Sequence, residues 1–189
     1  QVGRWRTMVE AVDAHTVGLG GDSLVALDES PELTIGPRRV IPLSTLAATY
    51  PQVLEVLRYQ AGVKKPDRPD LYGRFALAQG REVPGLAPDD QEVLDLLEDG
   101  PRPLTALVEE IHYGSLALRR LEDLEARRLV LRSGFTPTDA LHVLGVFRRW
   151  NGEAARLGAQ LLAARLGISV EALCQRVTSG VSDRVTTAL

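Results

Sequence analysis

A polar segment near the start of the sequence, residues 12–23, combines residue types that could do chemistry. Asp13 and His15 lie two positions apart, so on a strand they would face the same side. A carboxylate and an imidazole placed in this way could bind a divalent metal or orient a substrate, although two ligands are too few for a structural metal site. The alternative interpretation is that both are polar residues on the exposed face of a strand.

Glycines follow in the same segment, and Gly20, Gly21 and Ser23 are candidates for substrate binding. Glycine has no Cβ, so the backbone can approach a ligand closely and hold a phosphate or a substrate oxygen with its N–H groups. Phosphate-binding loops normally lead into a helix, whereas this turn leads into a strand predicted at residues 24–27. The turn also matches neither a dinucleotide-binding fingerprint nor a Walker A loop. A tight turn between two strands is therefore the alternative.

A second polar segment, residues 136–145, contains Asp139 and His142. Their spacing of three places them on one face of a helix, which suits two metal ligands or an acid–base pair. The segment also has a structural explanation, because Thr136 would cap a helix that begins at Pro137 and Asp139 would complete a capping box. The Asp–His pairs of the two segments are candidates for one catalytic or metal-binding cluster, which requires the segments to meet in the fold.

The elements that must position these segments follow an α+β pattern. Residues 1–61 are predicted to contain a small β segment followed by two helices. Residues 62–87, with their Pro- and Gly-rich loops, are predicted to be a linker that holds one strand, at residues 71–78, between its two loops. From 88 to 135 the order helix, helix, helix, strand is typical of a winged helix-turn-helix. Residues 136–189 are predicted to form a C-terminal helical segment.

Two local features of the predicted helices concern caps and burial. Ser44 would cap the helix that begins after Pro42. In the last helix, Leu173 and three valines recur at every fourth position, which predicts a buried stripe. Cys174 lies among apolar residues of the same helix and is predicted to be a buried small side chain.

The composition is ordinary for a globular protein of one or two domains. Of 189 residues, 44% are hydrophobic and 25% are charged. The net charge of −3 does not favour a polyanion or an anionic membrane as partner. A single cysteine excludes an internal disulfide and fits a reducing compartment, and no apolar run approaches the roughly 20 residues that span a bilayer. The sequence therefore predicts a cytoplasmic protein without a membrane partner.

Both polar segments resemble signature segments of the hydantoinase/oxoprolinase family. The family pattern Asp-x-His-Thr-x-Gly-x-Gly-Gly-x-Ser is matched by Asp13, His15, Thr16, Gly18, Gly20, Gly21 and Ser23. The pattern Thr-x-Thr-Asp-Ala-x-x-x-Leu-Gly is matched by Thr136, Thr138, Asp139, Ala140, Leu144 and Gly145. Residues 33–38 are similar to the family's Leu-x-Val-Gly-Pro, whereas Asp22 stands where many relatives carry glycine. Residues 39–130 would replace the Gly-Pro-Ala-Cys-Tyr-Gly pattern common in the family.

The resemblance implies part of an enzyme with an actin-like ATPase fold. The family's usual chemistry is the ATP-dependent opening of cyclic amides such as 5-oxoproline or hydantoins. ATP and a divalent metal are therefore the cofactors expected of the parent enzyme, and its partners would be a small-molecule substrate and the remainder of the polypeptide. The family's Gly-Gly-Thr and Gly-Gly-Ala-Gly-Pro nucleotide-binding motifs are not present in this sequence. We therefore expect an internal fragment that does not bind ATP tightly and is inactive in isolation.

A regulatory or protein-interaction module built on the winged helix is the alternative function. In a DNA-binding version, residues 115–124 would be the recognition helix and 129–135 the wing. The residues that could reach phosphates are Arg119, Arg120, Arg127 and Arg128. Residues 89–135 nevertheless carry 11 acidic residues against 6 arginines and no lysine, whereas DNA binding needs a basic surplus. The charge therefore favours protein contacts over nucleic acid.

Overall fold

The computed structural model describes residues 20–27, 32–81, 83–111 and 115–187. Helices and two small sheets make up this part of the chain, so the predicted α+β class is confirmed at that level. The first sheet is a hairpin in which β1 (Ser23–Leu27) pairs antiparallel with β2 (Leu33–Arg39). Alternate residues of β1 are buried, as expected for a strand with one face on the core.

The second sheet has four strands in the order β3, β6, β4, β5. Their bounds are Ile41–Pro42, Val130–Gly134, Phe75–Ala78 and Arg102–Pro103 in that order. β6 is an inner strand, parallel to β3 and antiparallel to β4. Successive strand residues point to opposite faces, so Phe75 and Leu77 contribute to one hydrophobic core and Ala76 to another. The sheet is thus shared by two cores. The core that contains Phe75 and Leu77 is called here the lower core, and the core that contains Ala76 the upper core.

The upper core lies under three helices, α3 (Pro88–Leu96), α4 (Leu104–Glu110) and α5 (Ser115–Ala126). We call residues 75–134 the winged-helix unit, because these helices are followed by β6 in the predicted order. The strand expected between the two loops of 62–87 is confirmed as β4, an inner strand with Phe75 and Ala76 fully buried. One expectation is corrected here. Residues 129–135 form no protruding wing, because β6 is enclosed between β3 and β4.

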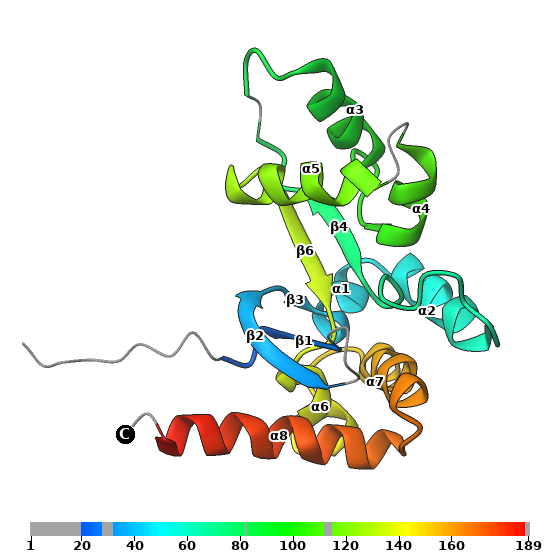
Figure 1. Cartoon of the computed structure of the whole chain (residues 1–189), viewed down its shortest axis with the longest axis vertical. Helices are drawn as coiled ribbons and strands as arrows, with labels where there is room; N and C mark the ends of the chain where they lie inside the picture. Colours follow the sequence, from blue (N-terminus) through cyan, green and yellow to red (C-terminus); the bar gives the residue numbers. More distant parts are fainter. Residues whose placement is uncertain (1–19, 28–31, 82, 112–114, 188–189) are drawn as a thin grey trace, which may run out of the picture.

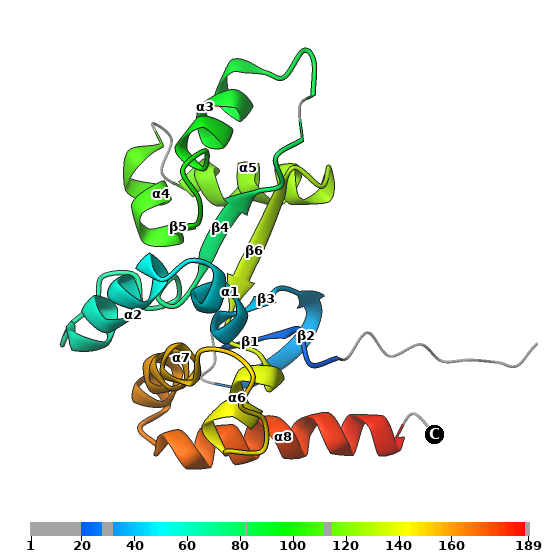
Figure 2. The same cartoon turned by 180° about the vertical axis from the view of Figure 1, so that it is seen from behind.

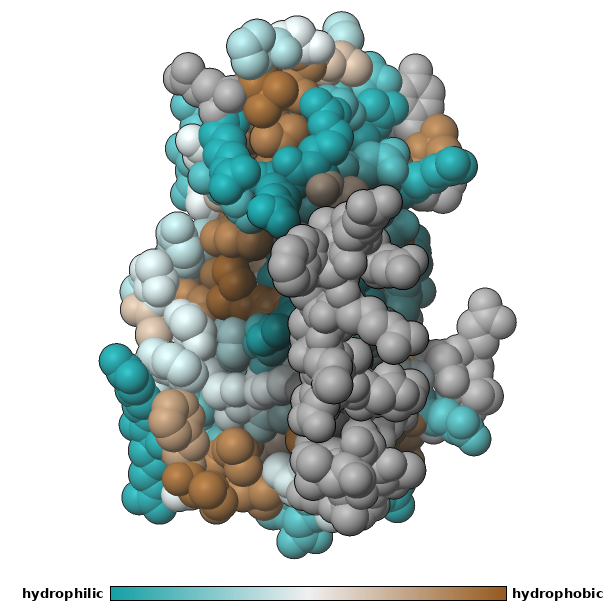
Figure 3. Space-filling view, turned by 90° about the vertical axis from the view of Figure 1, so that its left-hand side faces the viewer, coloured by the Kyte–Doolittle hydropathy of each residue, from teal (hydrophilic) through white to brown (hydrophobic). Residues whose placement is uncertain are grey.

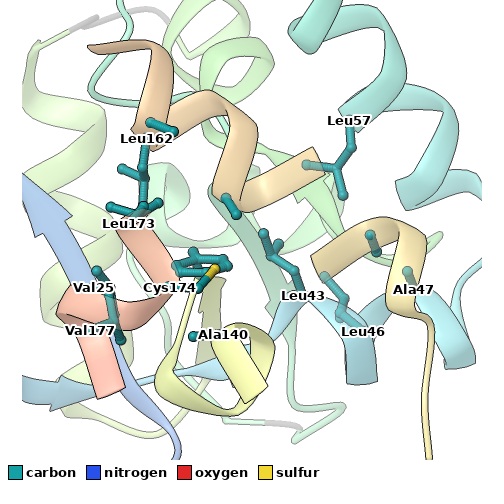
Figure 4. Close-up of a cluster of buried hydrophobic side chains, with 14 of the residues drawn as sticks. Val25, Leu43, Leu46, Ala47, Leu57, Ala140, Leu162, Leu173, Cys174 and Val177 are labelled. Atoms are coloured by element: carbon teal, nitrogen blue, oxygen red, sulfur yellow. The ribbon is translucent and has the colours of Figure 1, made fainter. Parts of the chain in front are cut away.

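The lower core is formed by the hairpin and five helices. They are α1 (Leu43–Thr49), α2 (Gln52–Gly62), α6 (Pro137–Val143), α7 (Gly152–Leu166) and α8 (Val170–Thr187). Figure 4 shows Leu173, Cys174 and Val177 of α8 pointing into this core, and all three are fully buried. The predicted burial of Cys174 is therefore confirmed, as is the first part of the predicted stripe on α8. Burial also raises the pKa of the Cys174 thiol to about 12.

Figures 1 and 2 show α3, α4 and α5 at one end of the molecule and α6, α7 and α8 at the other, with β4 and β6 running between them. On the side seen in Figure 3, the winged-helix unit presents mostly hydrophilic residues around a smaller apolar patch. Among the described residues, no single helix is long and apolar enough to cross a membrane. Only α7 and the first part of α8 reach that composition together, and they are bent by 95°.

Candidate functional site

Asp139 is the most constrained of the predicted site residues. Its side chain has 0% exposure, and its Oδ2 accepts hydrogen bonds from the Thr136 backbone N–H at 3.0 Å and the Thr136 hydroxyl at 3.0 Å. The Thr136 Oγ1 in turn accepts the Asp139 N–H at 3.3 Å. Pro137 is the first residue of α6, as predicted, so the predicted capping box is confirmed.

The same carboxylate also caps a second helix. The N–H groups of Leu43 and Ser44 donate to Asp139 Oδ2 at 3.1 Å and to Oδ1 at 2.8 Å. The prediction that Ser44 caps α1 was wrong, because the N-cap position is Pro42 and the acceptor comes from 95 residues away. Pro42 has no side-chain acceptor, so the free N–H groups of the first turn need one from elsewhere.

These contacts give Asp139 a structural role. Burial raises the pKa of its carboxyl, and the hydrogen bonds from Ser44, Thr136 and Leu43 oppose that rise. Both oxygens are engaged by donors at the starts of α1 and α6, and neither is accessible to solvent. The predicted catalytic role of Asp139 therefore receives no support from the geometry.

His142 is also buried, at 7% exposure. Its ring meets Phe147 edge-on with centroids 4.9 Å apart, and the Trp150 ring lies at 6.0 Å. Nε2 is buried, and it has no hydrogen-bond partner among the described residues. Burial lowers the pKa of His142, and the nearby Asp139 opposes that shift. The residue packs as a neutral aromatic side chain, as an internal histidine commonly does.

The other pair of the predicted cluster, Asp13 and His15, lies outside the described residues. The proposed meeting of Asp13 and His15 with Asp139 and His142 therefore stays a prediction. Within the part of the chain that the structure describes, no three His, Cys, Asp or Glu side chains come together as a metal site requires. Asp139 and His142 alone do not fit a metal ion, since the Asp139 oxygens are already bonded.

The predicted substrate-binding residues Gly20, Gly21 and Ser23 form a tight turn into β1. The Ser23 N–H donates to the Gly20 carbonyl at 3.0 Å, and the Gly20 N–H donates to Ser23 Oγ at 2.9 Å. Ser23 is fully buried, so its hydroxyl serves the turn. The turn leads into a strand, as the sequence indicated, and no helix begins there to hold a phosphate.

Asp22, the departure from the family's glycine, has a local explanation. Its Oδ2 accepts a hydrogen bond from Arg39 Nε at 2.7 Å, across the two ends of the hairpin. The Asp22 carboxylate raises the pKa of the Arg39 guanidinium. The pair is largely exposed, so it contributes little to stability.

The two segments that resemble the family meet at Gly21. The Thr138 N–H donates to the Gly21 carbonyl at 3.0 Å, and the Val25 N–H donates to the Phe135 carbonyl at 2.8 Å. A Cβ on Gly21 would lie 2.7 Å from Thr138 Oγ1, closer than such atoms approach. Only glycine therefore fits at this position without displacing Thr138.

The chain between these segments leaves and returns at adjacent points. Ile41 pairs with Ser133 and Pro42 with Gly134 in the parallel β3–β6 ladder, and Ser133 Oγ donates to the Ile41 carbonyl at 2.7 Å. Inserted domains typically have adjoining ends of this kind. The stretch from β3 to β6 thus begins and ends at adjoining points.

Arg132 is a buried charged residue that the sequence analysis did not single out. It lies on β6 at 7% exposure, and its guanidinium Nη1 is buried with no partner in the part of the chain that the structure describes. Burial lowers its pKa to about 10, Glu125 opposes that shift, and Arg38 and Arg74 add to it. Arg132 shares one face of the strand with Val130 and Gly134. Its place on the same face as a buried valine was the sequence signal that could have revealed its burial.

Arginines of the proposed recognition helix and of the residues just after it are engaged within the unit itself. Arg120 pairs with Asp89 at 2.8 Å and with Asp90 at 3.4 Å, and Arg127 pairs with Asp90 at 2.7 Å. Arg38 of β2 holds Glu122 of α5 at 3.0 Å. Two of the four arginines considered for phosphate contacts are therefore already paired with carboxylates.

No protein-family model, curated protein or solved structure matches this chain at a significant level.

Proposed function

We propose that this chain is part of an ATP-dependent hydrolase of the hydantoinase/oxoprolinase type, acting on cyclic amides such as 5-oxoproline or hydantoin-like compounds. The observation that supports this proposal is the contact between Gly21 and Thr138. It joins two segments, about 115 residues apart in the chain, that each resemble the family. Segments that belong to one family unit would have to meet in this way despite a long insertion.

The adjoining ends of the insertion support the same proposal. Residues 39–130 were expected to replace a short family segment, and the β3–β6 ladder returns the chain to its starting point. We infer that the hairpin and α6 keep the relation that they would have in a family member without this insertion. An actin-like parent fold belongs to the proposal as well.

The proposal assigns positioning roles to the residues of this chain. Asp139 fixes α6 and α1, and Thr138 holds the glycine turn against α6. ATP and its divalent metal would supply phosphoryl activation of the amide, and the described residues offer no ligand set for either. The proposal therefore places both on the remainder of the polypeptide.

The test uses the intact natural polypeptide with ATP and Mg²⁺. 5-Oxoproline and hydantoin are added separately, ADP release is followed, and the ring-opened product is identified by NMR. We expect ADP release that depends on the amide and equals the product formed. Absence of amide-dependent ADP release with both compounds contradicts the proposal.

The Gly21–Thr138 contact offers a matched variant series in the same protein. Gly21→Ala should lower kcat/KM by at least tenfold, because the added methyl group displaces Thr138. The double variant Gly21→Ala with Thr138→Ala removes the obstructing hydroxyl and should recover part of the activity. Gly62→Ala is the control, since nothing lies within 4 Å of a Cβ there.

A winged-helix regulatory module remains the alternative, and the ion pairs of Arg120 and Arg127 favour protein contacts over DNA within it. A carboxylate that pairs with an arginine offsets its positive charge, so such an arginine attracts phosphates less strongly. A gel shift with duplex DNA at low salt decides this point, and we expect no binding. A shifted band that disappears as salt rises would restore DNA binding.

A further inference from the structure

A cleft of about 490 Å³ is lined by residues of α2 and α4. Figures 1 and 2 show these two helices on the side of the molecule away from the hairpin. Its walls come from α2, the 63–74 loop, the short strand β5 and α4. The apolar residues that line it are Val56, Leu71, Pro103, Ala106 and Val108. All of these belong to the region without family resemblance, so the cleft stands apart from the proposed hydrolase activity.

The charge lining the cleft is mainly negative. Glu55 of α2, Asp67 of the loop and Glu109 of α4 contribute carboxylates from three separate elements, and all three are exposed. Arg68 is the one basic residue among the described lining residues, and its guanidinium pairs with Asp70 at 3.3 Å. The cleft therefore has an excess of acceptors for a cation.

Two tyrosines complete the cleft. Tyr59 is 73% exposed on α2, an unusual exposure for an aromatic side chain, and Tyr72 is half-buried in the loop. Burial raises the pKa of Tyr72, and Tyr59, Asp67 and Glu109 raise it further. All four side chains line the same cleft, so aromatic rings and carboxylates border one space.

We propose that this cleft binds the lysine or arginine side chains of a basic segment from a partner protein. The aliphatic stem of such a side chain would lie on the apolar floor, with its cationic head between the carboxylates. The Tyr59 ring offers a face to the same cation. The volume is within the range of natural binding sites and exceeds what one methylene stem fills.

A peptide segment fits the cleft better than a free amine does. Exposed ion pairs contribute about 0–1 kcal/mol each, so one small cation meeting solvated carboxylates would be held weakly. The carboxylates stand on both walls of the cleft, which allows successive basic residues of one segment to pair with them. Once one basic residue of a segment is bound, the next is held at a high effective concentration near its carboxylate. Separate small cations do not have this advantage.

The experiment measures binding of a dye-labelled, capped peptide of three arginines alternating with glycines to the whole chain, by fluorescence polarisation at low salt. A peptide with glutamates in place of the arginines is the ligand control. The cleft triple variant carries Glu55→Gln, Asp67→Asn and Glu109→Gln. The control triple variant carries Glu98→Gln, Asp99→Asn and Asp123→Asn, which removes the same charge at exposed positions outside the cleft.

We expect the cleft triple to weaken peptide binding at least tenfold and the control triple to change it less than twofold. Tyr59→Leu should weaken binding about threefold, corresponding to loss of a cation–π contact, and Tyr59→Phe should preserve it. Melting curves of all variants verify that they fold, and the exposed positions make loss of folding unexpected.

Three results would overturn the proposal. Equal weakening by both triples would show attraction to the overall negative charge of the protein. Spermidine binding as tightly as the peptide would assign the cleft to a small amine. Absence of peptide binding at low salt would show that the cleft binds no basic segment.

Discussion

Asp139 shows how one residue can resemble a catalytic group and yet serve the fold. Its two oxygens accept four hydrogen bonds from the starts of α1 and α6. A carboxylate at two helix N-termini is favoured by the free N–H groups and by both helix dipoles. The need for a hydrogen-bond acceptor at these two helix starts explains an aspartate at this position without a catalytic role.

Replacing Asp139 by alanine should cost about 3–5 kcal/mol of unfolding free energy, because several buried donors lose their acceptor together. The measurement is urea denaturation followed by circular dichroism. Asp123→Ala, on the exposed face of α5, is the control and should change stability by less than about 0.5 kcal/mol. Equal effects of the two variants would contradict the double-capping role.

His142 should make stability depend on pH near neutrality. Burial lowers its pKa below the unfolded value, so protons bind the unfolded chain preferentially. The stabilising contribution is present above the unfolded pKa of about 6.5 and is lost as pH falls through the folded pKa. His142→Phe keeps an aromatic ring beside Phe147 and should flatten the decline between pH 7 and pH 5. An unchanged slope would show that His142 is not buried in its neutral form.

The contact between α7 and α1 is the clearest close approach of two elements. A Cβ on Gly158 of α7 would overlap Leu43 Cδ1 and lie 3.2 Å from Phe135 Cδ2. Both neighbours are buried in the lower core, so neither has free space to move into. Glycine allows this approach although it lowers the helix propensity.

Gly158→Ala should therefore destabilise the protein by about 1–3 kcal/mol through overpacking, despite the better helix propensity of alanine. Gly152→Ala at the start of the same helix is the matched control, since nothing lies within 4 Å of a Cβ there. That variant should leave stability unchanged or raise it slightly. Thermal unfolding of the two proteins side by side measures the difference.

At the scale of the whole molecule, the shared sheet joins the two cores. β4 and β6 run antiparallel with Ala78 opposite Val130, and the Gln79 N–H donates to the Leu129 carbonyl at 2.9 Å. The helices α3, α4 and α5 are therefore connected to the rest of the chain at one end of the β4–β6 pair, where β4 ends and β6 begins. The lower core takes its sheet residues from the other face of these strands.

Replacing residues 80–128 by Asn-Gly should close β4 and β6 into a two-residue hairpin and leave the lower core folded. The shortened chain keeps the β1–β2 hairpin, α1, α2 and α6 to α8, so we expect cooperative unfolding and dispersed NMR signals. It loses α4 and should lose basic-peptide binding. A broad, non-cooperative transition would show that the lower core depends on the winged-helix unit.

The sequence by itself determined the local structure of this protein. The capping box at Thr136, the strands of the hairpin and the buried face of α8 depend on residue spacing, and spacing is written in the chain. The resemblance of the two polar segments to one family also came from the sequence alone and underlies the proposed function.

Only the tertiary structure decided which partners these residues meet. Asp139 caps α1 from 95 residues away, Gly21 rests against Thr138, and the strand expected at residues 71–78 pairs with β6 and β5 as an inner strand. Contacts between distant parts of a chain depend on how helices and strands pack, and neither propensity nor periodicity encodes that packing directly. The same packing opened the acidic cleft between α2 and α4, whose residues lie too far apart in sequence to form a recognisable motif.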